Sequence, residues 1–333
     1  MGITHLDQLQ VSGVPTMGMG GLPPFWGNFW FVDPVNGSDG NSGSADHPFQ
    51  TLAQAQLQAV ANNNDVVLFK GGGAATGAGS CYQTSTLKWA KAQVHLIGVC
   101  APLLQGKRAR IAASSSLAGT AGFNMLVQVT GAGCLFANLQ AFYGFSNTAA
   151  ALIAWEDDAG RSTYINCEFL GFGDNTTSTG TANLTGARAI KLNNNVGETT
   201  FINCEFGGNT TSRNATNYTM EIAGGCPRIV IRDSLFTSWL GSSGGASSHI
   251  LIGASGIDRD FTVKNTLFMS SVLSGGGTAM AQGLNINAAP GGDILLSNCT
   301  SFGLSAWETT PSGNVYTDMG TPSGAAGGKS VVL

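Results

Sequence analysis

The stretch Tyr164-Ile165-Asn166-Cys167-Glu168-Phe169 returns almost unchanged at Phe201-Ile202-Asn203-Cys204-Glu205-Phe206, with five of the six positions identical. Weaker copies are Ile231-Arg232-Asp233-Ser234-Leu235-Phe236 and Val263-Lys264-Asn265-Thr266-Leu267-Phe268. Two more copies, at 136–142 and 296–302, carry one extra residue before the phenylalanine. Self-similarity at a spacing of a few tens of residues indicates a repeat architecture, in which each repeat is one supersecondary unit.

An asparagine or aspartate occupies the same place in all six copies, at spacings that range from 28 to 37 residues. These residue types tolerate a left-handed backbone better than other side chains, so we predict that the chain bends at each of them. Stacked asparagine side chains can also hydrogen-bond from one repeat to the next. The predicted turn ladder consists of Asn138, Asn166, Asn203, Asp233, Asn265 and Asn298.

Each copy follows a second short apolar segment, and several of these segments alternate apolar with polar residues, as half-buried strands do. One repeat is therefore a strand, a short turn, a second strand and a loop rich in Gly, Ser, Thr and Asn. The best fit is an all-β fold, a single-stranded right-handed parallel β-helix in which each repeat forms one coil. The predicted core ladder of stacked rings consists of Phe142, Phe169, Phe206, Phe236, Phe268 and Phe302.

The composition excludes several classes of protein. Charged residues make up 10% of the 333 residues, and the net charge is −4 with 15 scattered Lys and Arg. A nucleic-acid-binding protein needs a basic surface, so we expect no nucleic-acid partner. The hydrophobic share of 43% is enough for a sizeable core and excludes disorder. No apolar run reaches the length of about 18 residues that spans a bilayer, so we expect no membrane partner.

The cysteines and histidines indicate neither a metal site nor a cofactor. Seven cysteines lie far apart without a Cys-x-x-Cys pair, and none of the four histidines lies near a second ligand at metal spacing. We expect buried free thiols, which suggest folding in a reducing compartment. Residues 1–20 lack the basic start and the apolar stretch of a secretory signal.

We predict three parts along the chain. Residues 1–28 form an extended N-terminal arm, residues 29–303 form the β-helix, and residues 304–333 form a Gly- and Ser-rich tail. A helix over about 50–61 is expected to cap the first coil, because the exposed end of a solenoid must be covered. The arm carries apolar residues that would be costly to expose unless they pack on a partner, namely Leu6, Leu9, Val11, Val14, Met17, Leu22, Phe25 and Trp26.

Two segments resemble known families. Residues 31–40 (Phe-Val-Asp-Pro-Val-Asn-Gly-Ser-Asp-Gly) and 47–52 (His-Pro-Phe-Gln-Thr-Leu) resemble the opening of pectin-lyase-like β-helix proteins. Together with the Asn-Cys-x-Phe repeats, this resemblance covers about residues 29–303. It implies the fold rather than a function, because this fold hosts lyases, hydrolases, isomerases, viral tailspikes and structural rods. Residues 4–15 resemble the short N-terminal leaders of bacteriophage structural proteins.

The resemblances imply a phage virion protein on the capsid surface, made in the host cytoplasm. We expect a non-enzymatic capsid decoration or cement protein whose arm binds the major capsid protein or another virion protein. Viral β-helices of this kind associate as trimers, so the resemblance also implies a homotrimer. The alternatives are a tailspike-like protein that binds or depolymerises a glycan, and a secreted pectin-active enzyme.

Carboxylates are the candidates for catalysis, because glycoside cleavage needs two of them about 5–9.5 Å apart. Glu168 and Glu205 are stacked one coil apart, but the other copies lack the acid. The cluster Glu156-Asp157-Asp158 is expected at a solvated turn, and Asp258-Arg259-Asp260 is expected to form a turn ion pair. The segment 33–41, with its Asp and Asn residues, faintly resembles a calcium loop but also fits a plain turn. We therefore expect no catalytic residue and no metal.

Overall fold

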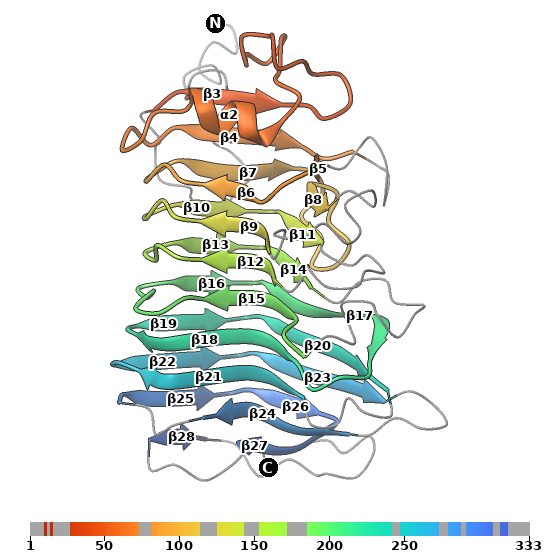
Figure 1. The fold of residues 1–333 in the computed structure, drawn as a ribbon, viewed down its shortest axis with the longest axis vertical. Coiled ribbons are helices and arrows are strands. Elements are labelled where there is room, and N and C mark those ends of the chain that lie inside the picture. Colours follow the sequence, from red (N-terminus) through yellow and green to blue (C-terminus); the bar gives the residue numbers. More distant parts are fainter. Residues whose placement is uncertain are drawn as a thin grey trace, which may run out of the picture.

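The computed structural model describes residues 27–72, 81–113, 125–142, 153–171, 185–241, 247–272, 279–287, 291–308 and 314–318, with the backbone of Gln10–Val11 and Val14–Pro15. Strands stack one below another along the long axis of the molecule, from the N-terminal to the C-terminal end (Figure 1). From β3 onward every strand pair is parallel and joins one coil to the next. The predicted all-β parallel β-helix is confirmed.

Three sheets form the sides of the coils. Sheet 1 contains β3 (Phe29–Val32), β4 (Val66–Lys70), β7 (His95–Val99), β10 (Leu135–Ala137), β13 (Thr163–Ile165), β16 (Thr200–Ile202), β19 (Ile229–Arg232), β22 (Asp260–Lys264), β25 (Asp293–Ser297) and β28 (Val315–Thr317). Sheet 2 contains β5 (Cys81–Gln83), β8 (Arg110–Ala113), β11 (Gln140–Phe142), β14 (Glu168–Leu170), β17 (Glu205–Arg213), β20 (Leu235–Leu240), β23 (Leu267–Val272) and β26 (Thr300–Phe302). Sheet 3 contains β6 (Leu87–Trp89), β9 (Met125–Val129), β12 (Ile153–Asp157), β15 (Arg188–Leu192), β18 (Tyr218–Cys226), β21 (Ser248–Ile257), β24 (Met280–Ile286) and β27 (Leu304–Glu308).

The core of the rod is built from stacked aromatic rings. Phe206 and Phe236 stack with their centroids 4.6 Å apart, and Phe236 and Phe268 with theirs 4.8 Å apart. Phe169 extends this stack, 5.6 Å from Phe206. Each parallel, in-register pair of rings contributes about 0.5–1.5 kcal/mol beyond the burial of its area. Four of the six predicted core phenylalanines therefore lie one above another inside the coils.

The other two predicted core phenylalanines lie outside the core, which corrects the prediction. Phe142 is half-buried and Phe302 is exposed. The extra residue before each ring moves it by one position, and successive strand residues point to opposite faces. The positions in register with the stack are occupied by Ala141, which pairs with Phe169, and by Ser301, which pairs with Phe268.

The capping helix is shorter than predicted. Helix α2 spans Leu52–Gln58, and Thr51 caps it by accepting a hydrogen bond from the Gln54 amide. Leu52 and Ala55 are buried against the first coil, whereas Leu57 and Val60 are exposed. Seven residues make two turns, so one narrow face of the helix is enough to cover the end of the rod.

The β-helix continues beyond the predicted boundary at residue 303. Strand β27 pairs with β24, and β28 pairs with β25, both in parallel register. The first residues of the predicted tail are therefore part of the last coil. At the other end, Gln10–Val11 (β1) and Val14–Pro15 (β2) form an antiparallel pair within the predicted arm. No helix in the described part of the chain is long and apolar enough to cross a membrane.

Candidate functional site

The six predicted turn positions share one backbone conformation and stack into a ladder. All six have positive φ, between 49° and 56°. The side-chain amide of Asn166 donates to Asn138 (2.9 Å), and that of Asn203 donates to Asn166 (3.2 Å). In the later coils, the side-chain amide of Asn265 donates to Asp233, and that of Asn298 donates to Asn265. Because a carboxylate has no N–H to donate, Asp233 cannot pass the chain of bonds on to Asn203.

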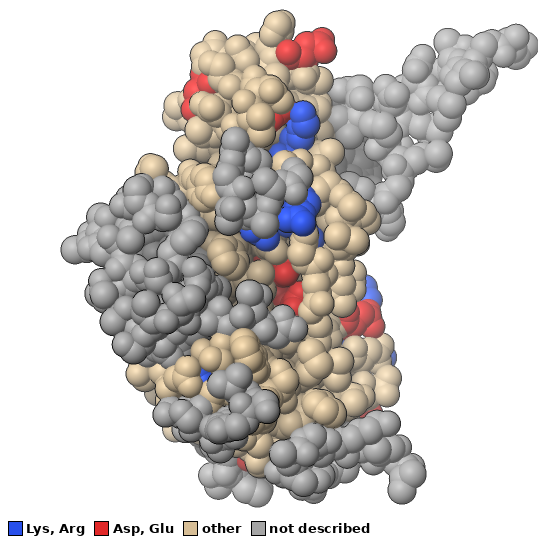
Figure 2. Space-filling view, turned by 90° about the vertical axis from the view of Figure 1, so that its right-hand side faces the viewer, with Lys and Arg blue, Asp and Glu red and all other residues tan. Residues whose placement is uncertain are grey.

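A row of polar side chains crosses the outer face of sheet 2. Arg110 is in register with Gln140, Gln140 with Glu168, and Glu168 with Glu205. They face outward because each glutamate directly precedes an inward phenylalanine and side chains alternate along a strand. The backbones of Glu168 and Glu205 are thus one strand spacing apart, about 4.8 Å. Figure 2 shows basic and acidic side chains close together near the middle of this side of the rod.

The segment Gln105–Lys107, which leads into β8, covers the two carboxylates. Glu168 accepts hydrogen bonds from the backbone N–H groups of Gly106 (3.0 Å) and Lys107 (3.2 Å). Glu205 accepts one from the side-chain amide of Gln105 (2.7 Å). Only 3% of Glu168 and 2% of Glu205 remains exposed. The carboxylates hold this segment onto the sheet and are in turn sealed by it.

Arg110 is linked to the carboxylates through Gln140. The Arg110 Nε donates to Gln140 Oε1, and Gln140 Nε2 donates to Glu168 Oε2 at 2.5 Å. The guanidinium also lies 5.2 Å from the centroid of the outward Phe142 ring. Burial lowers the pKa of Arg110, and the nearby Glu168 opposes that shift. Phe142 therefore packs on a cation at the surface instead of joining the core stack.

The Glu205 carboxyl keeps its proton at neutral pH. Burial, followed by the charge of Glu168, raises the pKa of Glu205 to about 8. The neighbouring Glu168 accepts hydrogen bonds from two backbone N–H groups and from the Gln140 amide. Glycoside cleavage uses two carboxyl groups that face one substrate, but here the segment Gln105–Lys107 covers both.

The second acidic cluster is a solvated turn only at Asp158, which is exposed and accepts a hydrogen bond from the Asn193 side chain (2.7 Å). For Glu156 and Asp157 the prediction is wrong, because both are buried. Glu156 lies on the outer face of β12, nearly buried, 3.5 Å from the ammonium group of Lys191. Asp157 points into the rod, where it accepts from the Tyr164 hydroxyl (2.8 Å) and the backbone N–H of Gly160 (2.9 Å). Burial raises the pKa of Asp157, and these hydrogen bonds oppose the shift. This carboxylate closes a turn from the inside.

The remaining acidic motifs have local structural roles. Asp258 pairs with Arg259 at 3.5 Å on the surface. Asp33 accepts from Lys70 Nζ (2.7 Å) and from Asn36; burial alone would raise its pKa, but these hydrogen bonds lower it to about 2. Asp39 accepts from the backbone N–H of Thr51 (2.8 Å), at the start of α2. Among the described residues, no three His, Cys, Asp or Glu side chains are grouped to hold a metal ion.

The predicted arm contacts lie mostly outside the described residues. Leu6, Leu9, Met17, Leu22, Phe25 and Trp26 are outside them, and for Val11 and Val14 the backbone alone is described. All seven cysteines are free thiols; Cys100 is half-buried and the others are buried.

A polar cluster inside the rod around His249 is not among the features predicted from the sequence. This fully buried imidazole has Nε2 3.0 Å from Ser270 Oγ and Nδ1 3.5 Å from Thr219 Oγ1. Ser270 Oγ is in turn 2.9 Å from Ser238 Oγ. Burial, followed by the charge of Arg213, holds the pKa of His249 well below its usual range. The imidazole is therefore neutral, and it serves the interior packing of the last coils.

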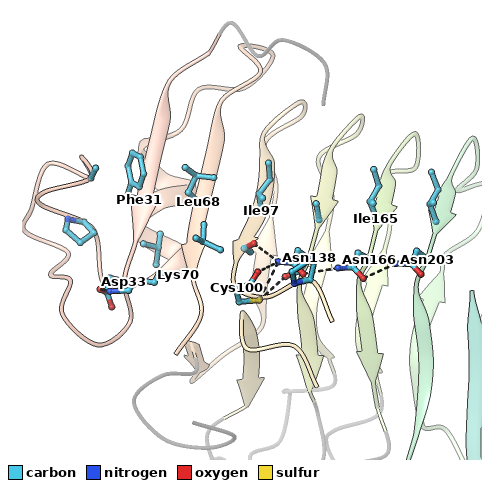
Figure 3. A pocket seen from close by; sticks show the side chains of 18 of the residues that line it. Phe31, Asp33, Leu68, Lys70, Ile97, Cys100, Asn138, Ile165, Asn166 and Asn203 are labelled. Carbon is cyan, nitrogen blue, oxygen red and sulfur yellow. Dashed lines mark hydrogen bonds and ion pairs between the residues drawn. The ribbon is translucent and has the colours of Figure 1, made fainter. Parts of the chain in front are cut away.

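A groove with a volume of about 870 Å³ lies on the outer face of sheet 1 and is likewise not among the features predicted from the sequence (Figure 3). Its floor is one row of apolar side chains in register from strand to strand. We call this row the apolar stripe; it consists of Phe31, Leu68, Ile97, Ala137, Ile165 and Ile202. The turn ladder forms one edge of the groove. This apolar row could have been predicted from the sequence, because the residue before each of the first three ladder asparagines is apolar although it faces outward.

Comparison with known proteins identifies the fold. The pectate lyase Pel9A is 14% identical and matches 87% of this chain and 78% of its own, with a TM-score of 0.52. The pectin methylesterase PemA from Erwinia chrysanthemi is 11% identical over 93% of this chain and 86% of its own, with a TM-score of 0.47. No protein-family model and no curated protein sequence matches the chain. Likeness at this level of identity shows a pectate-lyase-like β-helix and nothing about activity.

Proposed function

We propose that this chain is a non-enzymatic structural protein of a phage virion, most specifically a decoration or cement protein of the capsid. Its N-terminal residues would bind the major capsid protein or a neighbouring virion protein, and the β-helix would project outward. The phage-like leader over residues 4–15 and the low share of charged residues, 10%, support this proposal.

The observation that carries the proposal is the sealing of the carboxylate pair. Glu168 and Glu205 are the best candidates for an acid and base, yet both side chains are buried, and Glu168 and one oxygen of Glu205 bind the segment Gln105–Lys107 instead of facing an open cleft. A general acid must come within hydrogen-bond reach of the substrate. In this geometry the pair fastens a loop to the rod, which is a structural role.

A homotrimer is part of the proposal. A closed symmetric assembly would cover a share of this weakly charged surface. Its mass, three times 34.1 kDa, is measurable by sedimentation or light scattering of the full chain.

Cosedimentation with virus particles tests the attachment. The truncated chain should begin at Gly27, because Gly27 and Asn28 pack on the rod. Asn28 N donates to Asp65 Oδ1 (2.7 Å), and Gly27 lies so close to the backbone of Asn63 that a Cβ there would be 2.4 Å from Asn63 O. We expect the full chain to sediment with particles that lack it, and the chain without residues 1–26 to remain in solution. A chain without residues 319–333 is the matched control and should still bind. Binding of the 27–333 chain at full strength would refute the role of the arm.

A second candidate function, cleavage of an acidic polysaccharide, is favoured by one observation. The raised pKa of Glu205, about 8, beside the hydrogen-bonded carboxylate of Glu168 is suited to acid catalysis if Gln105–Lys107 were to move. Loss of viscosity of pectate or of host-surface polysaccharide tests it. We expect no turnover; turnover that disappears in both Glu168→Gln and Glu205→Gln would replace the structural proposal by this one.

A further inference from the structure

The apolar stripe is a second hydrophobic surface, separate from the core of the rod. Leu68, Ile97 and Ala137 point away from the core, yet they are only 8%, 3% and 1% exposed. A parallel row beside the stripe adds Phe29, Val66 and Leu135 to the same apolar cluster. Phe31, Ile165 and Ile202 of the same stripe are half-buried, so part of this apolar surface stays open to an occupant.

The stripe has defined ends. It begins at β3, the first strand of sheet 1, and it stops after β16, since the next positions in the same row are Arg232 and Lys264. From β3 to β16 there are five strand spacings of about 4.8 Å, so the stripe is about 24 Å long. Along the edge of the stripe, the side chains of Asn138, Asn166 and Asn203 are already hydrogen-bonded to one another in the ladder. The groove therefore suits an uncharged, apolar and extended occupant.

The chain itself supplies a segment of this kind. Residues 17–26 read Met-Gly-Met-Gly-Gly-Leu-Pro-Pro-Phe-Trp, with five large apolar side chains and no charge. The two prolines disfavour a helix and favour an extended backbone of about 3.1 Å per residue. At that rise, about eight residues span the length of the stripe. The segment also joins β3 directly, at the end where the stripe begins.

We propose that residues 17–26 dock along the apolar stripe of their own chain, with Phe25 and Trp26 nearest β3 and Met17 or Met19 near Ile202. The covered stripe is then part of the folded protomer. Residues 1–16 leave the rod at its middle, beside β16, and not from its capped end. This inference does not depend on the proposed virion role.

Amide hydrogen exchange of the full chain tests the docking. In the native protein we expect the amides of residues 17–26 to exchange at least tenfold more slowly than in a synthetic peptide of the same sequence. Ile165→Glu places a charge in the middle of the stripe and should abolish this protection. Leu295→Glu is the matched control, since Leu295 is an exposed outward residue of the same sheet beyond the stripe, and it should leave the protection intact.

Other occupants give different results. Exchange of residues 17–26 at the free-peptide rate would overturn the proposal, and so would protection that survives Ile165→Glu. Protection that is lost on dilution would mean that the segment docks on a second copy, and it would overturn docking within one chain. Binding of a hydrophobic dye gives an independent readout: removing residues 1–26 should raise it severalfold, and an unchanged signal would contradict the inference. Binding to virus particles and amide exchange are separate measurements. The docking proposal can therefore fail while the virion proposal stands, and the reverse.

Discussion

Replacing Glu205 by glutamine should remove a fall in stability that the native protein shows between about pH 6.5 and pH 8. The folded carboxyl has a pKa of about 8 against 4.5 for the ordinary group. In this window the folded state still holds a proton that the unfolded chain has released, so stability decreases as the pH rises. For these two pKa values the decrease is between about 1 and 2 kcal/mol, because the folded carboxyl is half ionised at pH 8.

The histidines contribute in the opposite direction, and they do so equally in the native protein and in the variant. Burial lowers the pKa of His95 to about 4 and holds that of His249 well below 6.5, so both are neutral in the folded protein above that pH. Their contribution to stability rises with pH, and each still adds about 0.4 kcal/mol above pH 6.5 because the unfolded imidazole is half protonated there. The difference in slope between the native protein and Glu205→Gln therefore isolates the effect of Glu205.

Denaturant unfolding at the two pH values measures the effect. In Glu205→Gln the new amide side chain keeps the shape of the site and can accept the hydrogen bond from Gln105, so the variant should fold. Glu198→Gln is the matched control: Glu198 is bonded to Arg161 and Arg228, which lower its pKa, so it is ionised throughout the window. The control should keep the native slope. An equal slope in Glu205→Gln and the native protein would refute the reasoning.

Three further substitutions test the fold. Phe236→Ala removes a fully buried ring that stacks on both neighbours, and it should lower the free energy of unfolding by about 3–5 kcal/mol; a loss under about 1 kcal/mol in denaturant titration would contradict the stacked core. Asp233→Asn gives the ladder a donor toward Asn203 while keeping a residue that tolerates φ of 54°, and it removes the exposed ion pair with Arg232 (2.7 Å), which contributes little. It should stabilise by up to about 1 kcal/mol in the same assay, whereas a destabilisation larger than that of Arg232→Ala would be evidence against the ladder. Asp39→Ala removes the acceptor of the Gln50 and Thr51 amides and should cost about 1–3 kcal/mol, with faster amide exchange at the start of α2; unchanged exchange there would contradict its capping role.

The sequence was sufficient for the parts of the fold that repeat. The asparagine positions mark the turns because a left-handed residue is needed once per coil, and the apolar residue two places earlier is inward in every copy, from Phe136 to Leu296. Phe142 and Phe302 were misplaced because the repeat was aligned by residue type. The alternation of faces, which an inserted residue reverses, places Ala141 and Ser301 in the core instead.

The state of the carboxylate pair could not be predicted in the same way. The register placed Glu168 above Glu205, but their burial depends on Gln105–Lys107, a segment that lies 61 to 100 residues away in sequence and belongs to no repeat. Its backbone N–H groups, which any residue could supply, carry no signal in the sequence. The apolar stripe, in contrast, was visible as outward apolar residues and was overlooked because the later copies carry Arg232 and Lys264.

The most direct test of the proposed virion role is to image the phage particles that are proposed to carry this chain. Reconstruction of purified particles should show rod-shaped densities that project from the capsid shell. Particles without such density, combined with a free chain that degrades an acidic polysaccharide through Glu168 and Glu205, would contradict the account.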